Sequence, residues 1–301
     1  IKQAIQVYPM YENAIRYARK ESVPEHLKRV SELWARFNEV AIQNPNAWIQ
    51  DAFTAEEIRT PTDTNRRISF PYTKMMNANM AVDMGAAIIL CSVEKARELR
   101  IPEEKWVYPL AGVQGYDHFS ASVRDNFHSS PGLGLVGKRV MELAKVSPEE
   151  VDYVDLYSCF PSAVQIAARE LGFSEERQLT VTGGLTFGGG PLNNYVMHAV
   201  ARTVELLRKA PGKKAFVSAN GGNLYKHVHC VYSSQAPEEP YQYENIQQEI
   251  DALPSRICLP EYDGKVEVES YSVMYTGEQP AIAHCSGITS DGARVCRIVR
   301  R

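Results

Sequence analysis

Residues 179–209 read LTVTGGLTFGGGPLNNYVMHAVARTVELLRK, and this stretch constrains the fold more than any other part of the chain. A short apolar run is followed by five glycines within eight residues, at positions 183, 184, 188, 189 and 190, and then by Pro191 and an amphipathic segment. Glycine lets the backbone adopt positive φ and approach a ligand closely. The free N–H groups at the start of a following helix favour an anionic or oxyanionic ligand. The pattern therefore predicts a strand, a ligand-binding glycine loop and a helix that Asn193 or Asn194 caps.

Composition narrows the class of protein. The chain has 301 residues, of which 44% are hydrophobic and 23% charged, as in a globular protein with room for two domains. A net charge of −3 provides no basic surface for nucleic acid, and no run of 18 apolar residues predicts a membrane span. The six cysteines form no C-x-x-C pair and no signal peptide is evident. We expect reduced thiols, no metal site and a cytoplasmic location.

Hydrophobic patterns predict a layered α/β core. Residues 1–60 are helical in pattern, which indicates a packed helical layer or a lid over a substrate. The apolar run Ala86–Cys91 predicts a strand buried on both faces. Beyond residue 106, strands and helices alternate, which favours a layered sheet. The expected helices cover 131–143 and 161–171, and the expected strands cover 151–157, 215–219 and 226–232.

The composition changes after residue 234. A polar linker leads into alternating strands, for which Asp263-Gly264 and Asp291-Gly292 supply hairpin turns. We expect a small β-rich domain there. The predicted organisation is a helical cap at 1–68, the end of one half-domain at 69–105, a second half-domain at 106–234, and a linker with the β domain at 235–301.

Several segments resemble the thiolase superfamily, especially its sterol-carrier-protein-type and thiolase-like branches. TVTGGLTFGGGPLNNYVMHAVA resembles the family's "GG…GHP" segment, and LYSCFPSAVQ resembles its "NEAF" or "HDCF" loop. SANGGN resembles "CxGGG", and FPYTKMMNANMAVDMGAAIIL resembles the segment that crosses the substrate cleft. The C-terminal β region resembles the additional domain of type 1 thiolase-like proteins. The resemblance implies a thiolase-like layered αβαβα core and an acyltransferase of the acetyl-CoA acetyltransferase type. It also implies a coenzyme A thioester as substrate and no tightly bound cofactor.

The resemblance also assigns site residues. Tyr157 occupies the position that in the family helps to hold a water or to polarise the thioester oxygen, and Cys159 lies two residues later in the same loop. His118 and His128 lie in a loop that would border the acyl end of the pocket, where either could supply a displaced base. The positions implied to bind the CoA ester are Gly188, Gly189, Gly190, Asn193, Asn220, Gly221, Gly222 and Asn79.

Two departures from the family pattern limit the chemistry that can be carried over. Gly190 stands where catalytic thiolases have the histidine of Gly-His-Pro, and Ala219 stands where they have an acid/base cysteine. Neither residue can transfer a proton, whereas the amides of the glycine loop still can stabilise an oxyanion. Two further functions therefore stay open: a tyrosine-dependent retro-aldolase acting on CoA-linked substrates, and a catalytically inactive CoA-ester-binding subunit.

Each candidate side chain also has a purely structural interpretation. Cys159 fits a small buried hydrophobe, and Tyr157 fits a core tyrosine. His118 and His128 fit histidines that stabilise a loop. His227-Val228-His229 places two imidazoles on one strand face without a carboxylate nearby in sequence, which favours a packed strand over a metal site.

The resemblance places the family's nucleophilic cysteine in a first half of the core that precedes the region matched at Ile1. We therefore expect an N-terminal half or a companion chain that pairs with Ala86–Cys91, and a homodimer formed through that half.

Overall fold

A five-stranded mixed sheet forms the centre of the molecule. The computed structural model describes residues 3–300. The strand order is β4-β5-β6-β3-β7, with bounds β3 Tyr108–Tyr116, β4 Tyr153–Asp155, β5 Lys214–Gly221, β6 Lys226–Ser233 and β7 Gln242–Asn245. The pairs β4–β5 and β3–β7 are parallel, and the two other pairs are antiparallel. Because β4 and β5 are parallel, the loops that follow them meet at one edge of the sheet.

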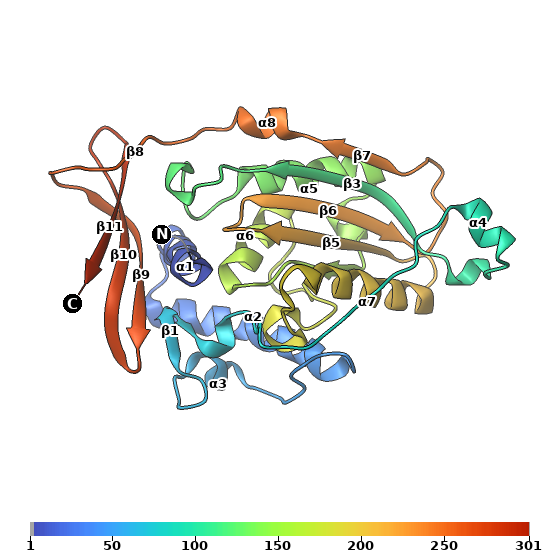
Figure 1. Cartoon of the computed structure of the whole chain (residues 1–301), viewed down its shortest axis with the longest axis horizontal. Helices are drawn as coiled ribbons and strands as arrows, with labels where there is room; N and C mark the ends of the chain where they lie inside the picture. Colours follow the sequence, from blue (N-terminus) through green and yellow to red (C-terminus); the bar gives the residue numbers. More distant parts are fainter. Residues whose placement is uncertain (1–2, 301) are drawn as a thin grey trace.

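Helices cover both faces of this sheet (Figure 1). They are α5 Pro131–Ala144, α6 Pro161–Leu171 and α7 Tyr195–Lys209. Side chains alternate along the strands. Phe216 of β5 faces Phe173, which follows α6, with ring centroids 5.5 Å apart. Its neighbours Asp155 and Val217, which are paired in β4 and β5, face the opposite side, where Tyr195 of α7 reaches Asp155. This layered α/β arrangement confirms the predicted fold class.

A second, six-stranded sheet stands beside the first. Its order is β2-β1-β9-β10-β11-β8, with bounds β1 Arg67–Phe70, β2 Tyr72–Thr73, β8 Cys258–Leu259, β9 Glu267–Thr276, β10 Gln279–Ile288 and β11 Arg294–Arg300. The predicted C-terminal strands therefore pair with two short strands from residues 67–73. Helix α1, Ala4–Ala18, lies between the two sheets (Figure 1). The Ser270 and Ser272 hydroxyls of β9 donate to backbone carbonyls of α1.

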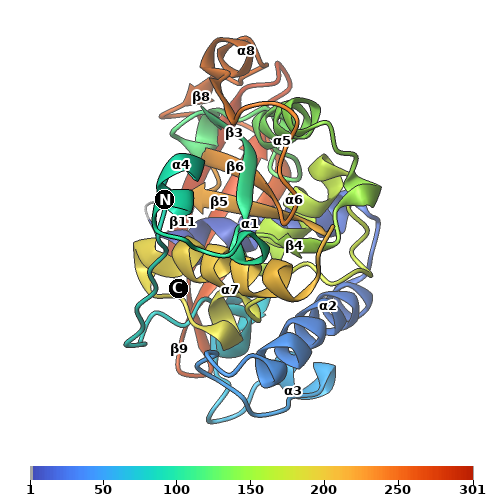
Figure 2. The ribbon, with the colours of Figure 1, turned by 90° about the vertical axis from the view of Figure 1, so that its right-hand side faces the viewer.

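The remaining helices are α2 Val23–Gln43, α3 Ala55–Arg59, α4 Val93–Glu98 and α8 Gln247–Asp251. Figure 2 shows α2 and α3 below α7 and to its right. Ser22 accepts from the Glu25 amide and begins α2, whose Leu33, Trp34 and Phe37 are buried. The N-terminal helices thus form a packed layer, as one of the two interpretations of their pattern predicts.

The helices expected at 131–143 and 161–171 are confirmed to within a residue, and α6 ends at Gly172 with φ of 74°. The agreement has a local cause. Proline in the first turn favours the start of a helix and glycine after the last turn favours its end, whatever the rest of the chain does. The strand expected at 151–157 is shorter, since only Tyr153–Asp155 pairs with β5.

Two predicted elements were wrong. Residues 86–91 form no strand, and Ile89 and Leu90 are 93% and 78% exposed. A strand needs neighbours, and the described residues supply none for this run. Asp263-Gly264 makes no hairpin, because β8 before it pairs in parallel with β11 instead of with β9. Asp291-Gly292 does join the antiparallel pair β10 and β11.

Candidate functional site

The edge formed by the ends of β4 and β5 brings together several of the predicted residues. The loop after β4 carries Tyr157 and Cys159, and β5 ends with Asn220 and Gly221. The Tyr157 amide donates to the Ser218 hydroxyl over 2.9 Å, which ties the loop to β5. The Asn220 amide nitrogen lies 3.8 Å from the Cys159 sulfur. The parallel pairing of the two strands thus places Cys159 and Asn220 in contact.

Helix α1 adds a residue that the sequence did not single out. The Asn220 side-chain amide donates over 3.0 Å to the hydroxyl of Tyr8, which in turn donates over 3.3 Å to the carbonyl of Gly222. The Tyr8 ring stacks on Phe160, with centroids 4.4 Å apart. Only the aromatic content of the first helical segment hinted at this role. The side-chain oxygen of Asn220 is buried and has no hydrogen-bond partner among the described residues, which leaves an unused acceptor at this edge.

Tyr157 presents a free phenol at this edge. Its side chain is half-buried, and its ring meets the Tyr195 ring edge-on at 5.5 Å between centroids. Within residues 3–300 its hydroxyl makes no hydrogen bond. Burial raises the pKa of Tyr157 above its usual value, and the nearby Cys159 thiol raises it further. Tyr157 is therefore a neutral hydrogen-bond donor at physiological pH and not a phenolate base.

Cys159 is a buried thiol and not a thiolate. Only 9% of the residue is exposed, and burial raises the pKa of the thiol to about 12. The thiolate is the form that attacks a thioester. Deprotonating Cys159 would need a strong base beside it, and its neighbours Tyr8 and Asn220 supply none. The geometry agrees with the buried-hydrophobe interpretation of this residue.

The glycine loop is held by hydroxyl groups and by the segment that crosses it. The amides of Gly183 and Gly184, whose φ values are 96° and 73°, both donate over 3.1 Å to the Thr180 hydroxyl oxygen. The Asn79 amide donates to the Leu185 carbonyl over 3.0 Å, and the Gly190 amide donates to the Asn79 carbonyl over 2.9 Å. Asn79 thus contacts the loop through its backbone. The Gly190 amide would have to leave Asn79 before it could bind an oxyanion.

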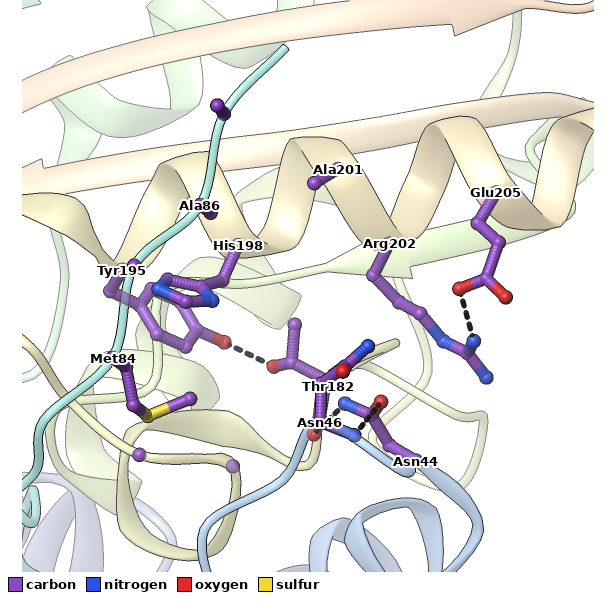
Figure 3. A pocket seen from close by; sticks show the side chains of 14 residues that line it. Asn44, Asn46, Met84, Ala86, Thr182, Tyr195, His198, Ala201, Arg202 and Glu205 are labelled. Carbon is purple, nitrogen blue, oxygen red and sulfur yellow. Dashed lines mark hydrogen bonds and ion pairs between the residues drawn. The ribbon is translucent and has the colours of Figure 1, made fainter.

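A cavity of about 440 Å³ opens beside this loop (Figure 3). Gly188 and Gly189 form part of its wall, and the segment Met84–Ala87 forms another part. Polar side chains from three segments complete the lining, namely Asn44, Asn46, Thr182, Tyr195, His198, Arg202 and Glu205. Arg202 is paired with Glu205 over 2.6 Å. Tyr157 touches this cavity's wall through its contact with Tyr195.

The other predicted residues lie elsewhere. Asn193 is exposed in a short 3₁₀ turn, and Asn194 precedes α7 without capping it through its side chain. Gly221 pairs with Lys226 in the β5–β6 hairpin. His118 lines a separate cavity of about 80 Å³ with Asp117 and Arg124.

Neither histidine of the β3–α5 loop reaches the Tyr157 loop. His128 is half-buried, and its pKa is lowered by burial and then by Arg169. Among the described residues, neither His118 nor His128 makes a hydrogen bond or ion pair with Tyr157 or Cys159. No group of three His, Cys, Asp or Glu side chains within residues 3–300 is arranged to hold a metal ion. No helix in that range is long and apolar enough to cross a membrane.

Solved structures identify the fold. No family model matches the chain. A crystal structure of a monomeric SCP2-thiolase-like protein type 1 from Mycobacterium smegmatis is 32% identical, with a TM-score of 0.88 over 98% of this chain and 66% of that chain. This chain has a thiolase-like fold. The structure of an Ltp2–ChsH2(DUF35) aldolase shares that fold at a TM-score of 0.57, with 18% identity over 74% of this chain and 62% of that one.

Curated relatives match more distantly. An acetyl-CoA acetyltransferase from Methanothermobacter thermautotrophicus is 24% identical over 62% of this chain and 51% of its own length. A 17-hydroxy-3-oxo-4-pregnene-20-carboxyl-CoA lyase from Mycobacterium tuberculosis is 26% identical over 52% of this chain and 40% of its own length. The chain thus spans about half or less of the length of these two curated relatives.

Proposed function

We propose that this protein binds an acyl-CoA thioester and makes or breaks a carbon–carbon bond beside the thioester carbonyl, in the acyltransferase class of the acetyl-CoA acetyltransferases. The proposal rests on the thiolase-like fold together with the free Tyr157 hydroxyl at the end of β4. A neutral phenol that no other side chain engages can donate a hydrogen bond to a thioester oxygen. Such a bond grows stronger as negative charge develops on that oxygen in the transition state.

Two further groups support ligand binding at this edge. The unpartnered oxygen of Asn220 offers an acceptor, and the Tyr8 hydroxyl lies against the same Asn220 side chain. The CoA ester is a substrate in this proposal, and no tightly bound cofactor is needed. Gly188 and Gly189, in the wall of the adjoining cavity, would lie along the bound ester.

The second candidate is retro-aldol cleavage of a CoA-linked substrate. It is supported by the hydroxyls of Tyr8 and Tyr157 near the Cys159 thiol, which stay neutral because burial raises their pKa values. Retro-aldol cleavage needs a base for the substrate hydroxyl and donors that stabilise the enolate. The two phenols can serve as such donors. One curated relative is a CoA lyase, and one structural neighbour is an aldolase.

We further propose that another polypeptide segment covers residues 86–91, supplied either by an N-terminal half or by a companion chain. The exposed apolar side chains of this run support the proposal, and one structural neighbour is a two-component assembly. A homodimer and a cytoplasmic location stay predictions. The similar protein from Mycobacterium smegmatis is described as monomeric.

Calorimetry and two product assays test this function. We expect the wild type to bind an acyl-CoA with a dissociation constant in the micromolar range. Tyr157→Phe should weaken binding or turnover by about tenfold, because it removes one hydrogen bond to a polarised oxygen. Tyr153→Phe, on the strand that precedes the Tyr157 loop, is the matched control and should leave both unchanged. Thiolysis of a 3-ketoacyl-CoA consumes free CoA, whereas cleavage of a 3-hydroxyacyl-CoA releases a carbonyl compound without it. The two assays therefore separate the two reactions, and an absence of CoA-ester binding would overturn both.

A further inference from the structure

Asp155, the last residue of β4, is a buried carboxylate that the proposed chemistry does not use. It is 0% exposed and faces α7. One carboxylate oxygen accepts from the Tyr195 hydroxyl over 2.9 Å. The other accepts from the Thr180 hydroxyl and the Val181 amide, each over 2.9 Å, and from the Thr182 hydroxyl over 3.3 Å. A carboxylate surrounded only by donors is satisfied in its ionised form.

The two threonines connect Asp155 to the glycine loop. The Thr180 hydroxyl oxygen accepts from the amides of Gly183 and Gly184, and the Thr182 hydroxyl oxygen also accepts from Gly184 over 3.1 Å. A hydroxyl has a single proton. Because the Thr180 hydroxyl donates its proton in a hydrogen bond to Asp155, the lone pairs of that oxygen stay free for the loop amides. The carboxylate therefore determines which way these hydroxyls point.

Tyr195 connects Asp155 to the candidate site. Its hydroxyl lies 2.8 Å from that of Thr182 and donates to Asp155, and its ring packs edge-on against Tyr157. Figure 3 shows Tyr195 and Thr182 joined at the wall of the cavity. Asp155 is thus hydrogen-bonded directly to the Thr180, Thr182 and Tyr195 hydroxyls, and it is connected to Tyr157 through the ring of Tyr195.

We propose that Asp155 is a positioning residue, whose carboxylate fixes the hydroxyls of Thr180, Thr182 and Tyr195 and thereby holds the glycine loop and the Tyr157 ring in the geometry that receives the CoA ester. The role in ligand binding rests on the proposed function. The control of loop geometry does not, because it follows from hydrogen bonds within the protein.

Protonation of Asp155 should loosen this arrangement. Burial raises the pKa of this carboxyl to about 6, although the hydrogen bonds from Val181, Thr180, Tyr195 and Thr182 act in the opposite direction. A protonated carboxyl must donate one bond, so at least one surrounding hydroxyl has to turn. The test must distinguish the titration of Asp155 from that of other titratable or charged groups near it. These groups lie on α7 (Tyr195, His198, Arg202 and Glu205), on the loop after β4 (Tyr157 and Cys159) and on β6 (Cys230).

Selective ¹⁵N-glycine labelling tests the proposal on the whole chain without any ligand. The label is confined to the 19 glycines, of which Gly183 and Gly184 report on the loop. We expect both signals to titrate with a midpoint near pH 6 in the wild type. They should still titrate in His198→Gln, which removes the histidine on the neighbouring turn of α7. The titration should be absent in Asp155→Asn.

A second variant keeps the proposal testable if Asp155→Asn fails to fold. Thr182→Val removes one of the two hydroxyls that accept from the Gly184 amide. The pH-dependent shift of the Gly184 signal should therefore become smaller, while Gly183, bonded only to Thr180, keeps its full shift. Loop glycines that do not titrate between pH 5 and 7 in the wild type, or that titrate equally in Asp155→Asn, would overturn the proposal.

Ligand affinity is measured separately. Asp155→Asn should lower the affinity for an acyl-CoA about tenfold, whereas Asp152→Asn, which removes a surface carboxylate paired with Lys213, should leave it unchanged. Equal affinities for Asp155→Asn and wild type would overturn the positioning role. A wild type that titrates as expected but binds no CoA ester would instead contradict the proposed function alone.

Discussion

Burial decides the chemistry of single polar residues in this chain, and Glu12 of α1 is the strongest example after Asp155. Its carboxylate is 0% exposed and accepts from His26, Tyr72 and Gln165 over 2.6, 2.6 and 2.7 Å. Burial alone would raise the pKa of Glu12, but hydrogen bonds from His26, Tyr72 and Gln165, with the charge of His26, lower it overall. The network joins α1, α2, β2 and α6 and so fixes the helix that carries Tyr8.

Glu12→Gln should therefore destabilise the protein by about 2 kcal/mol or more at pH 7, because the new amide group leaves a buried donor without an acceptor. Since the folded pKa is depressed, the stability from Glu12 is present above the unfolded value of 4.5 and is lost as pH falls through the folded pKa. Urea unfolding of wild type and variant should therefore converge below pH 4.5. Glu32→Gln, at an exposed position of α2, should change stability by less than about 0.5 kcal/mol. A difference between Glu12→Gln and wild type that stays constant from pH 7 to pH 3 would contradict this account.

At the scale of elements, the apolar run at 86–91 is the segment whose structure depends most on a covering partner. Ile89→Lys adds a charge to a side chain that is 93% exposed. It should leave stability within about 0.5 kcal/mol of wild type and reduce self-association or partner binding in light scattering. Val299→Lys, 56% exposed on β11 of the six-stranded sheet, is the control and should not change association. Unfolding of Ile89→Lys would show that the run is buried, and a strictly monomeric wild type at high concentration would rule out self-association through it.

The sequence predicted those elements whose signals are local. Pro131, Pro161 and Gly172 mark helix ends by their own backbone preferences, and the structure has those ends. Residues 86–91 and Asp263-Gly264 were misjudged because a strand is defined by its partner, and pairing is set by parts of the chain far away in sequence.

Tyr8 could not be anticipated from local signals either. It reaches the Asn220 turn across 212 positions of sequence, through the packing of α1. Asp155 lies inside a predicted strand, and the sequence pattern there does not distinguish a buried carboxylate that accepts several hydrogen bonds from an exposed one.

At the scale of the whole molecule, the two sheets and α1 form one arrangement around the candidate site. Ser270 and Ser272 of the six-stranded sheet hold α1 by its carbonyls, and α1 holds Tyr8 against the ends of β4 and β5. The C-terminal strands therefore contribute to the site without touching it. This explains physically why a β region so far along the chain belongs to the same folded unit.

The most direct test of the central claim is a crystal structure of the protein with a bound acyl-CoA. We predict that the thioester carbonyl oxygen lies within hydrogen-bond distance, about 2.5–3.0 Å, of the Tyr157 hydroxyl, with the ester beside Gly188 and Gly189. A CoA ester bound with its carbonyl away from the ends of β4 and β5, and with the Tyr157 hydroxyl still unpaired, would contradict the claim.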